Sequence, residues 1–165
     1  MTNEIKILHP FNSAVELGLR SLILLEHAYP TKLDIQRLIY YDYLLVHSGD
    51  AGGPTSIHPA TPHRSGEVLV KRKMLEQGLV LFMSRKLILR EYNKKGIFYY
   101  ASDNATPFID CLSSKYIGLL KERAMWVFET FSKMRDKELD KYFRQNLDKW
   151  GGEFENEAIL KFENL

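Results

Sequence analysis

Apolar residues recur at three- and four-residue spacing through most of this chain, a pattern typical of helices that bury one face. The first helix is predicted to begin after Ser13, because Ser13 and Glu16 form a capping-box pattern, and to end before Pro30. The second is predicted to begin after Asp34, a residue type that caps helices well, and to reach Val46. The residues expected on the buried face of the first helix are Val15, Leu19, Leu22, Ile23 and Leu25.

A third helical block and a hairpin are predicted further along the chain. Gly78 interrupts the helical pattern, which suggests that this block consists of two shorter helices. Leu87–Tyr92 and Ile97–Ala101 are rich in β-branched and aromatic residues and predict two strands, joined by a loop that ends at Gly96. Helices followed directly by a hairpin give the order of a winged-helix unit.

The remaining pattern is helical up to Trp150, with a polar break at residues 132–136. We therefore expect a mainly α (α+β) fold in a single domain that spans residues 1–165. Its parts are a winged-helix-like core with a β-hairpin wing over residues 1–104, a long C-terminal helical extension over 105–150 and an acidic tail over 151–165.

Residues 47–66 interrupt the succession of helices with a long loop that is rich in glycine, proline and histidine. Loops of this length inside a compact domain are uncommon, and they are usually either functional or disordered. Because glycine permits unusual backbone angles and proline stiffens the path, the composition predicts an ordered, shaped loop. The candidate residues for a structural or partner-binding role in and around it are Asp42, His47, Asp50, Gly52, Gly53, Pro54, His58, Arg64 and Glu67.

Asp42 falls on the apolar stripe of the second predicted helix, seven residues after Ile35 and four after Leu38. A carboxylate on such a stripe needs a cationic or hydrogen-bonding partner if it is buried. Two interpretations stay open at this point. Asp42 either lies at the edge of the stripe and meets solvent, or it holds the long loop through Arg64 or backbone amides.

The composition limits the classes of function. The chain has 165 residues, a formal net charge of +2 and 45% hydrophobic residues, which fits one soluble domain without bulk attraction to nucleic acid. The single cysteine, Cys111, cannot form an internal disulfide and favours a reducing compartment. The sequence shows no secretory signal and no apolar segment long enough to span a bilayer, so we expect a cytoplasmic protein without a membrane partner.

Catalytic and cofactor sites find no support in the residue spacing. His47, Asp50, His58 and His63 are metal-ligand types, but they lack the tight pairs of recognisable zinc motifs. The glycine-rich residues 49–53 are not followed by the Lys-Ser/Thr ending of a phosphate-binding loop, and no serine or cysteine has triad spacing. We therefore expect no catalytic residue, no metal and no cofactor, and we predict that the chain is not an enzyme.

Basic residues gather in the predicted helix-and-hairpin block. The candidates for phosphate contact are Lys71, Arg72, Lys73, Arg85, Lys86, Arg90, Lys94 and Lys95. Residues 78–87 are mostly apolar and lack side chains that read base edges, which argues against sequence-specific DNA recognition. Non-specific phosphate contact stays open. Tyr40, Tyr41 and Tyr43 cannot share one helical stripe, so we also expect exposed aromatic surface of the kind found at protein interfaces.

Several short motifs carry a resemblance to a known family. They are His9-Pro10-Phe11-Asn12-Ser13 with Glu16 and Gly18-Leu19-Arg20, Leu33-Asp34-Ile35-Gln36-Arg37-Leu38, the run from Asp42 to Asp50, Gly52-Gly53-Pro54, His58-Pro59, Thr61-Pro62, Arg64-Ser65-Gly66-Glu67, Gly78-Leu79 and Met83-Ser84-Arg85. With these motifs the chain resembles the second type of middle component of bacterial ABC three-component conflict systems, a group that includes Lamassu anti-phage defence. The resemblance implies a small non-catalytic subunit that joins an SMC-like (structural-maintenance-of-chromosomes-like) ATPase, which senses DNA, to an effector that is often a nuclease.

A second function from another class stays open. In a winged-helix transcriptional regulator, a helix of the unit enters a groove of DNA and the hairpin contacts backbone phosphates. The apolar character of residues 78–87 makes this the less favoured of the two interpretations.

Overall fold

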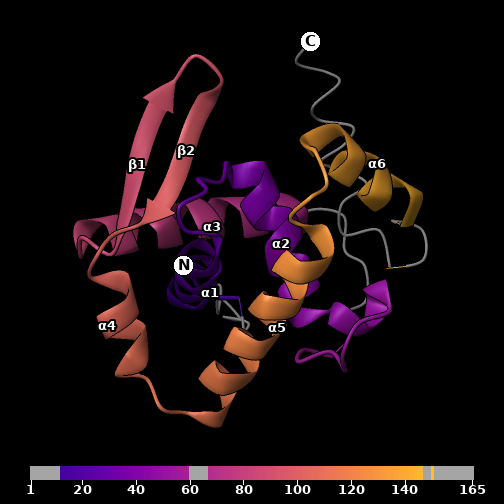
Figure 1. Cartoon of the computed structure of the whole chain (residues 1–165), viewed down its shortest axis with the longest axis horizontal. Helices are drawn as coiled ribbons and strands as arrows, with labels where there is room; N and C mark the ends of the chain where they lie inside the picture. The colour runs from indigo at the N-terminus through magenta and orange to yellow at the C-terminus, as the bar shows by residue number, and fades with distance from the viewer. Residues whose placement is uncertain (1–11, 60–66, 147–149, 151–165) are drawn as a thin grey trace, which may run out of the picture.

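The computed structural model describes residues 12–59, 67–146 and 150. Helices dominate this part of the chain, and a single hairpin lies between the third and fourth α-helices (Figure 1). The elements are α1 (Ala14–Ala28), α2 (Ile35–Val46), the short 3-10 helix η1 (Ser48–Ala51), α3 (Glu67–Ser84), β1 (Ile88–Asn93), β2 (Gly96–Ala101), α4 (Ala105–Asp110), α5 (Lys115–Phe131) and α6 (Asp136–Asn146). The predicted mainly α (α+β) class is therefore confirmed.

The helix starts follow the capping residues that the sequence shows. The Ser13 hydroxyl accepts a hydrogen bond of 3.2 Å from the Glu16 amide, and the Asp34 carboxylate accepts one of 2.8 Å from the Arg37 amide. These bonds satisfy amide groups that have no partner within the first helical turn. Local sequence signals thus set the beginnings of α1 and α2 as predicted.

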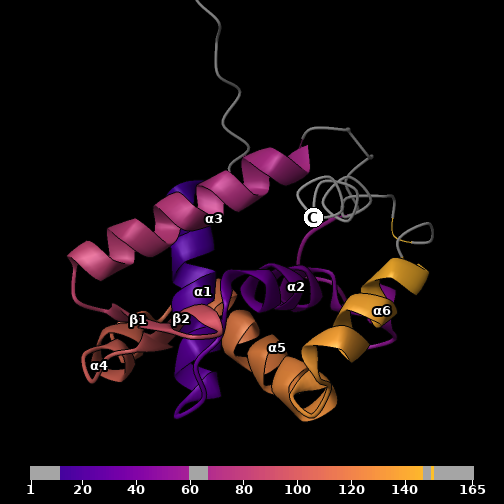
Figure 2. The same cartoon turned by 90° about the horizontal axis from the view of Figure 1, so that it is seen from above.

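Helix α2 is the centre of the core. All residues from Leu38 to Val46 are buried, including Tyr40, Tyr41 and Tyr43. Figure 2 shows α2 between α3 on one side and α5 on the other. The inference that these three tyrosines cannot all be buried is therefore wrong, because neighbouring elements cover this helix all round and not along one stripe. Exposed aromatic side chains are present elsewhere, at Tyr29 and Tyr92.

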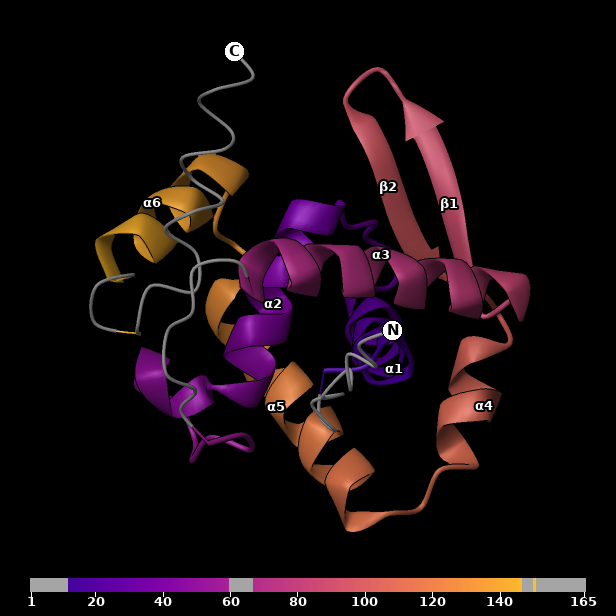
Figure 3. The same ribbon diagram turned by 180° about the vertical axis from the view of Figure 1, so that it is seen from behind.

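Helices α1 and α3 cross at two glycines (Figure 3). A Cβ atom added to Gly78 would lie 2.6 Å from the amide nitrogen of Gly18 and would also strike the carbonyl oxygen of Ala14. The ring of Phe82 covers Gly18 from the α3 side. The predicted break at Gly78 is wrong: α3 is continuous there, and the glycine serves close packing.

The hairpin matches its prediction closely. Strands β1 and β2 pair antiparallel, with Asn93 opposite Gly96, so that Lys94 and Lys95 form the turn. Leu33, between α1 and α2, adds a bridge to Tyr99 of β2 through backbone hydrogen bonds of 3.0 and 2.8 Å. This bridge ties the base of the hairpin to the helical core.

Helices α5 and α6 bury the residues that their spacing predicts. Leu120, Ala124 and Val127 of α5 are fully buried, and Phe143 of α6 is 1% exposed. Val15 is an exception to the predictions for α1, since its side chain is 58% exposed.

The subdivision of the chain at residues 104 and 150 stays a prediction. Within the described residues no helix combines the length and apolar character that a membrane crossing requires.

Candidate functional site

The polar centre of the molecule is a buried ion pair between α1 and α2. The guanidinium of Arg20 donates two hydrogen bonds to the Asp42 carboxylate, from Nε at 2.6 Å and from a terminal nitrogen at 2.9 Å. Both side chains are fully buried. Burial alone would raise the pKa of Asp42, but the charges of Arg20 and Lys71 outweigh it and hold that pKa below its usual range. Asp42 is therefore a carboxylate at neutral pH.

Helix α3 contributes the third charge of this cluster. The ammonium of Lys71 lies 3.5 Å from the second oxygen of Asp42 and 5.7 Å from the centre of the Tyr43 ring. Asp42 thus joins three helices through charged groups. The partners found for it are Arg20 and Lys71, whereas Arg64, which the sequence suggested, lies outside the described residues. The Glu16 carboxylate, one turn earlier in α1, lies 3.8 Å from a terminal nitrogen of Arg20.

The first thirteen residues of the long loop, 47–59, are ordered as predicted, and residues 60–66 lie outside the described part. The η1 turn ends at Gly52, whose φ of +72° is a left-handed value that favours glycine. The Ser48 hydroxyl donates to the carbonyl of Pro54 at 2.8 Å, and the Gly49 amide donates to the Ser56 hydroxyl at 3.0 Å. These bonds close the loop on itself.

Helix α5 holds the loop from one side. The side chain of Arg123 donates two hydrogen bonds, of 2.9 and 3.2 Å, to the carbonyl oxygen of Thr55. The ring of Trp126 lies against the backbone of Gly53 so closely that a Cβ atom there would overlap it. A side chain at position 53 is therefore incompatible with this contact between the loop and Trp126.

A second attachment joins the loop to α2 and to the chain after α6. The Tyr43 hydroxyl donates to the Asp50 carboxylate at 2.6 Å, and the indole N–H of Trp150 donates to the Asp50 carbonyl at 2.9 Å. The Tyr43 and Trp150 rings stack with centroids 5.3 Å apart. Asp50 thus connects elements that are a hundred residues apart in the sequence.

His58 ends the described loop beside the charged cluster. Its Nε2 atom lies 2.9 Å from the hydroxyl oxygen of Tyr116, and that hydroxyl donates to Glu16 at 3.3 Å. Burial, and then the nearby charge of Arg20, lower the pKa of His58 to about 4, so its imidazole is neutral at pH 7. Burial also raises the pKa of Tyr116 to about 12. These groups hold the end of the loop against α1 and α5.

The metal-ligand types do not converge. In residues 12–59, 67–146 and 150, no three His, Cys, Asp or Glu side chains are placed to hold a metal ion. The rings of His47 and His58 are perpendicular, with centroids 6.2 Å apart. His63 lies outside the described residues, as does the side chain of Glu67.

The predicted phosphate contacts separate into two groups. The ammonium of Lys71 forms an ion pair with Asp42, and the side chain of Arg72 lies 3.5 Å from Glu76. Arg90 lies over the ring of Tyr92 at 4.9 Å. The exposed cations of this set are Lys73, Arg85, Lys86, Arg90, Lys94 and Lys95, which lie on α3, just after its C-terminal end, on β1 or at the hairpin turn.

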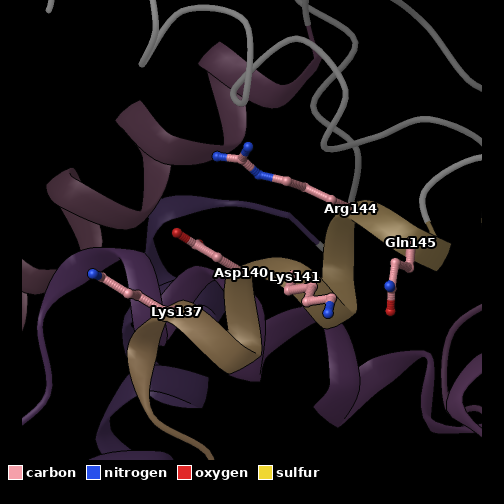
Figure 4. A pocket seen from close by; sticks show the side chains of 5 residues that line it. All are labelled: Lys137, Asp140, Lys141, Arg144 and Gln145. Carbon is pink, nitrogen blue, oxygen red and sulfur yellow. The ribbon is translucent and has the colours of Figure 1, made fainter.

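Helix α6 presents a further basic face. Lys137, Lys141 and Arg144 recur at helical spacing and line a shallow surface pocket with Asp140 and Gln145 (Figure 4). The Tyr40 hydroxyl donates to Asp140 at 2.6 Å and so joins this face to α2.

Sequence reasoning missed Arg20, Tyr116, Arg123 and Trp126 as parts of this site. The sequence does indicate a buried Arg20, because this cation stands inside an apolar run that ends at Leu25. A cation on one apolar stripe and a carboxylate on another predict a pair, because an unpaired buried charge is too costly. The sequence gives no indication of a role for Arg123 or Trp126, because both side chains contact the backbone of the loop.

The fold and this site define a mainly helical α+β protein whose buried charges and ordered loop lock its helices together. Residues 10–153 match the family model described as ABC-three component (ABC-3C) system Middle Component 2. Because the match spans most of the 165 residues, the chain belongs to this family, and it is an accessory middle component of an ABC three-component system. No curated protein and no solved structure matches the chain significantly.

Proposed function

We propose that this chain is a non-catalytic subunit of a bacterial anti-phage defence complex of the Lamassu kind, acting in the cytoplasm. It bridges an SMC-like ABC ATPase to a nuclease-type effector. Membership in the middle-component family supports the proposal at its coarsest level. The partners and the bridging role are proposals beyond that membership.

The observation that carries the bridging role is the ordered loop at residues 47–59. It is bonded to α2, to α5 and to Trp150, yet Gly49, Asp50, Gly52 and Thr55 are exposed along it. A surface that is already ordered loses little conformational entropy when a partner binds. The loop is therefore suited to protein recognition. Its hydrogen bonds fix the shape of the exposed surface, and we assign them no catalytic role.

Co-purification of the tagged chain with the ATPase and the effector tests this function. Wild type is expected to retain both partners. The double variant Asp50→Ala/Arg64→Ala is expected to lose assembly or defence, because Asp50 holds the loop to Tyr43. The control is Asp103→Ala/Lys115→Ala, which removes two exposed charges elsewhere. Normal assembly and protection by the loop variant would refute the proposed role of the loop.

The second candidate is a winged-helix DNA-binding transcriptional regulator. The Leu33–Tyr99 bridge favours it, since helix, bridge, two helices and hairpin follow each other in the order of that unit. The exposed Lys94 and Lys95 at the turn are suited to phosphate contact. Binding of the chain to DNA across salt concentrations separates the two functions. Tight binding with sequence preference would establish the regulator, whereas weak, steeply salt-dependent binding fits a subunit with non-specific contact.

A further inference from the structure

The segment that joins α3 to the hairpin concentrates the positive charge of the chain. Residues 72–95 carry seven Lys and Arg side chains and two carboxylates, which gives this segment a net charge of +5. The whole chain has a formal net charge of +2, so the residues outside the segment are negative on balance. Charge of one sign gathered in one place attracts a partner of opposite charge even where the overall charge is small.

Neither carboxylate neutralises the exposed cations of this segment. Glu76 lies 3.5 Å from Arg72, one turn earlier on α3, and Glu91 lies 3.0 Å from Lys32, which is outside the segment. Asp103, at the base of the hairpin, adds one exposed negative charge. The cations that remain are exposed and make no ion pair within the described part of the chain; they are Lys73, Arg85, Lys86, Arg90, Lys94 and Lys95. They outnumber Asp103 by five charges.

The two faces of the hairpin differ in charge. Arg90 and Tyr92 point to the same face, because alternate residues of a strand do so, and the guanidinium lies 4.9 Å from the centre of the Tyr92 ring. Glu91 points to the opposite face, where Lys32 pairs with it and lies 4.6 Å from the centre of the Tyr100 ring. Of the residues in β1 and β2, none on the Arg90 face is acidic.

The tip of the hairpin is suited to hydrogen bonding with an anion. Tyr92, Asn93, Lys94 and Lys95 are consecutive and exposed, and each side chain has a group that donates hydrogen bonds. The side-chain oxygen of Asn93 accepts a hydrogen bond of 2.8 Å from the Lys95 amide, which fixes the turn and leaves the Asn93 NH2 group available as a donor. Tyrosine, asparagine and lysine side chains are among those that contact the phosphates of nucleic acids.

The length of the hairpin favours a nucleic-acid duplex over an acidic peptide. Lys86 precedes β1 and Lys94 follows it, so at about 3.3 Å per residue these two cations are up to roughly 26 Å apart. A DNA duplex carries one negative charge per about 1.7 Å of its axis, so cations spread over this length meet phosphates in any register. A peptide would have to match its carboxylates to separate cations and seat an apolar anchor in a recess. The apolar side chains at the tip protrude instead, since Tyr92 is 64% and Ile97 43% exposed.

We propose that the edge formed by the hairpin and the C-terminal end of α3 binds the phosphate backbone of a nucleic-acid duplex without reading its sequence. Lys94 and Lys95 contact phosphates at the tip, and Arg90 contacts them along β1. Arg85 and Lys86 extend the contact to the base of the hairpin. This differs from the readout that a transcriptional regulator requires, because phosphates carry no sequence information. The inference goes beyond the bridging function and does not depend on it, since these residues are exposed in the chain by itself.

Fluorescence anisotropy of a labelled DNA duplex of mixed sequence, titrated with the full chain between about 50 and 200 mM salt, tests the assignment. For wild type, the logarithm of the association constant is expected to fall linearly with the logarithm of the salt concentration. Lys94→Gln/Lys95→Gln is expected to reduce the magnitude of that slope by about 2, because each lost phosphate contact contributes about 0.9. The matched control is Lys137→Gln/Lys141→Gln, which removes two exposed charges from α6, on the other side of the molecule from the hairpin (Figures 1 and 2). This control is expected to keep the wild-type slope, and an equal loss in it would overturn the proposal.

A third variant separates the charge of the turn from its shape. Lys94→Arg/Lys95→Arg keeps both positive charges and is expected to keep the wild-type slope. Loss of binding in this variant would show that the shape of the turn matters and not its charge, and it would overturn the proposal. All the substituted positions are exposed, so the variants are expected to fold, and their circular dichroism spectra check this.

Further probes identify the occupant. A labelled RNA duplex of the same sequence distinguishes RNA from DNA as the source of the phosphates. Tighter binding to poly-glutamate or to a single strand than to the duplex would overturn the proposal, as would a strong preference for one sequence. If wild type binds no duplex, this inference fails and the bridging function still stands, because co-purification with the partners is measured separately.

Discussion

Replacing Asp42 with Asn tests whether the buried charge cluster stabilises the fold. The variant keeps the shape of the side chain but leaves Arg20 and Lys71 without their shared counter-charge in a site that is 0% exposed at Asp42. Removing one partner of a buried ion pair costs about 3–5 kcal/mol, because the remaining charge stays desolvated. Since domains are stable by only about 5–15 kcal/mol, this is a large fraction of the free energy of unfolding.

Chemical and thermal denaturation measure the loss. A cost of this size lowers the melting temperature of a domain of this length by roughly 6–20 °C. Glu138→Gln is the control, because it breaks the exposed Arg135–Glu138 pair and is expected to leave the denaturation curve unchanged. Urea titration at low temperature keeps the measurement possible if Asp42→Asn is unfolded at room temperature.

The double variant Arg20→Met/Asp42→Leu separates charge from packing. It removes both members of the pair together and is expected to be more stable than Asp42→Asn alone, because no buried guanidinium is left without its counter-ion. A loss below about 1 kcal/mol for Asp42→Asn would refute the reasoning, since that magnitude is typical of a solvated surface pair.

Two further predictions follow from the packing and from the pKa of His58. Gly78→Ala is expected to destabilise the protein by about 1–3 kcal/mol, because its Cβ would strike α1, whereas Gly118→Ala, which meets nothing within 4 Å in α5, is expected to stabilise it; urea denaturation of both variants checks the contrast. The folded pKa of His58, about 4, lies below the unfolded value of 6.5, so the unfolded chain binds more protons between these values and stability falls as pH drops through that window. Unfolding free energies at pH 7.5 and 5.0 should differ by roughly 2 kcal/mol from this group, and His58→Gln should remove that part of the difference; an unchanged difference would contradict the assignment.

The predictions that succeeded rest on local chemistry. Ser13 and Asp34 cap their helices because their side-chain oxygens meet amides three residues away, and no distant residue is needed for this. The hairpin follows from two strand-forming segments and a turn between them. The ordered beginning of the loop likewise follows from glycine and proline positions.

The predictions that failed depend on contacts between distant segments. Gly78 reads as a helix breaker because the sequence does not show that Gly18 of another helix lies against it. Tyr40 reads as a residue with one exposed side because periodicity assumes a helix with a solvent face, and α2 has none. For the same reason the sequence points to Arg64 or backbone amides of the nearby loop as partners of Asp42, although the cation lies on α1.

The charge cluster explains how three helices keep one relative placement. Apolar contacts are non-directional and tolerate small shifts, whereas a guanidinium that donates two hydrogen bonds to one carboxylate requires a specific geometry. Sliding α1 or α3 along α2 would separate Arg20 or Lys71 from Asp42 and leave charges unpaired away from water. The loop begins at the end of α2, and the hairpin begins just after α3. A partner that contacts both therefore meets surfaces at a fixed separation, and its binding need not order them first.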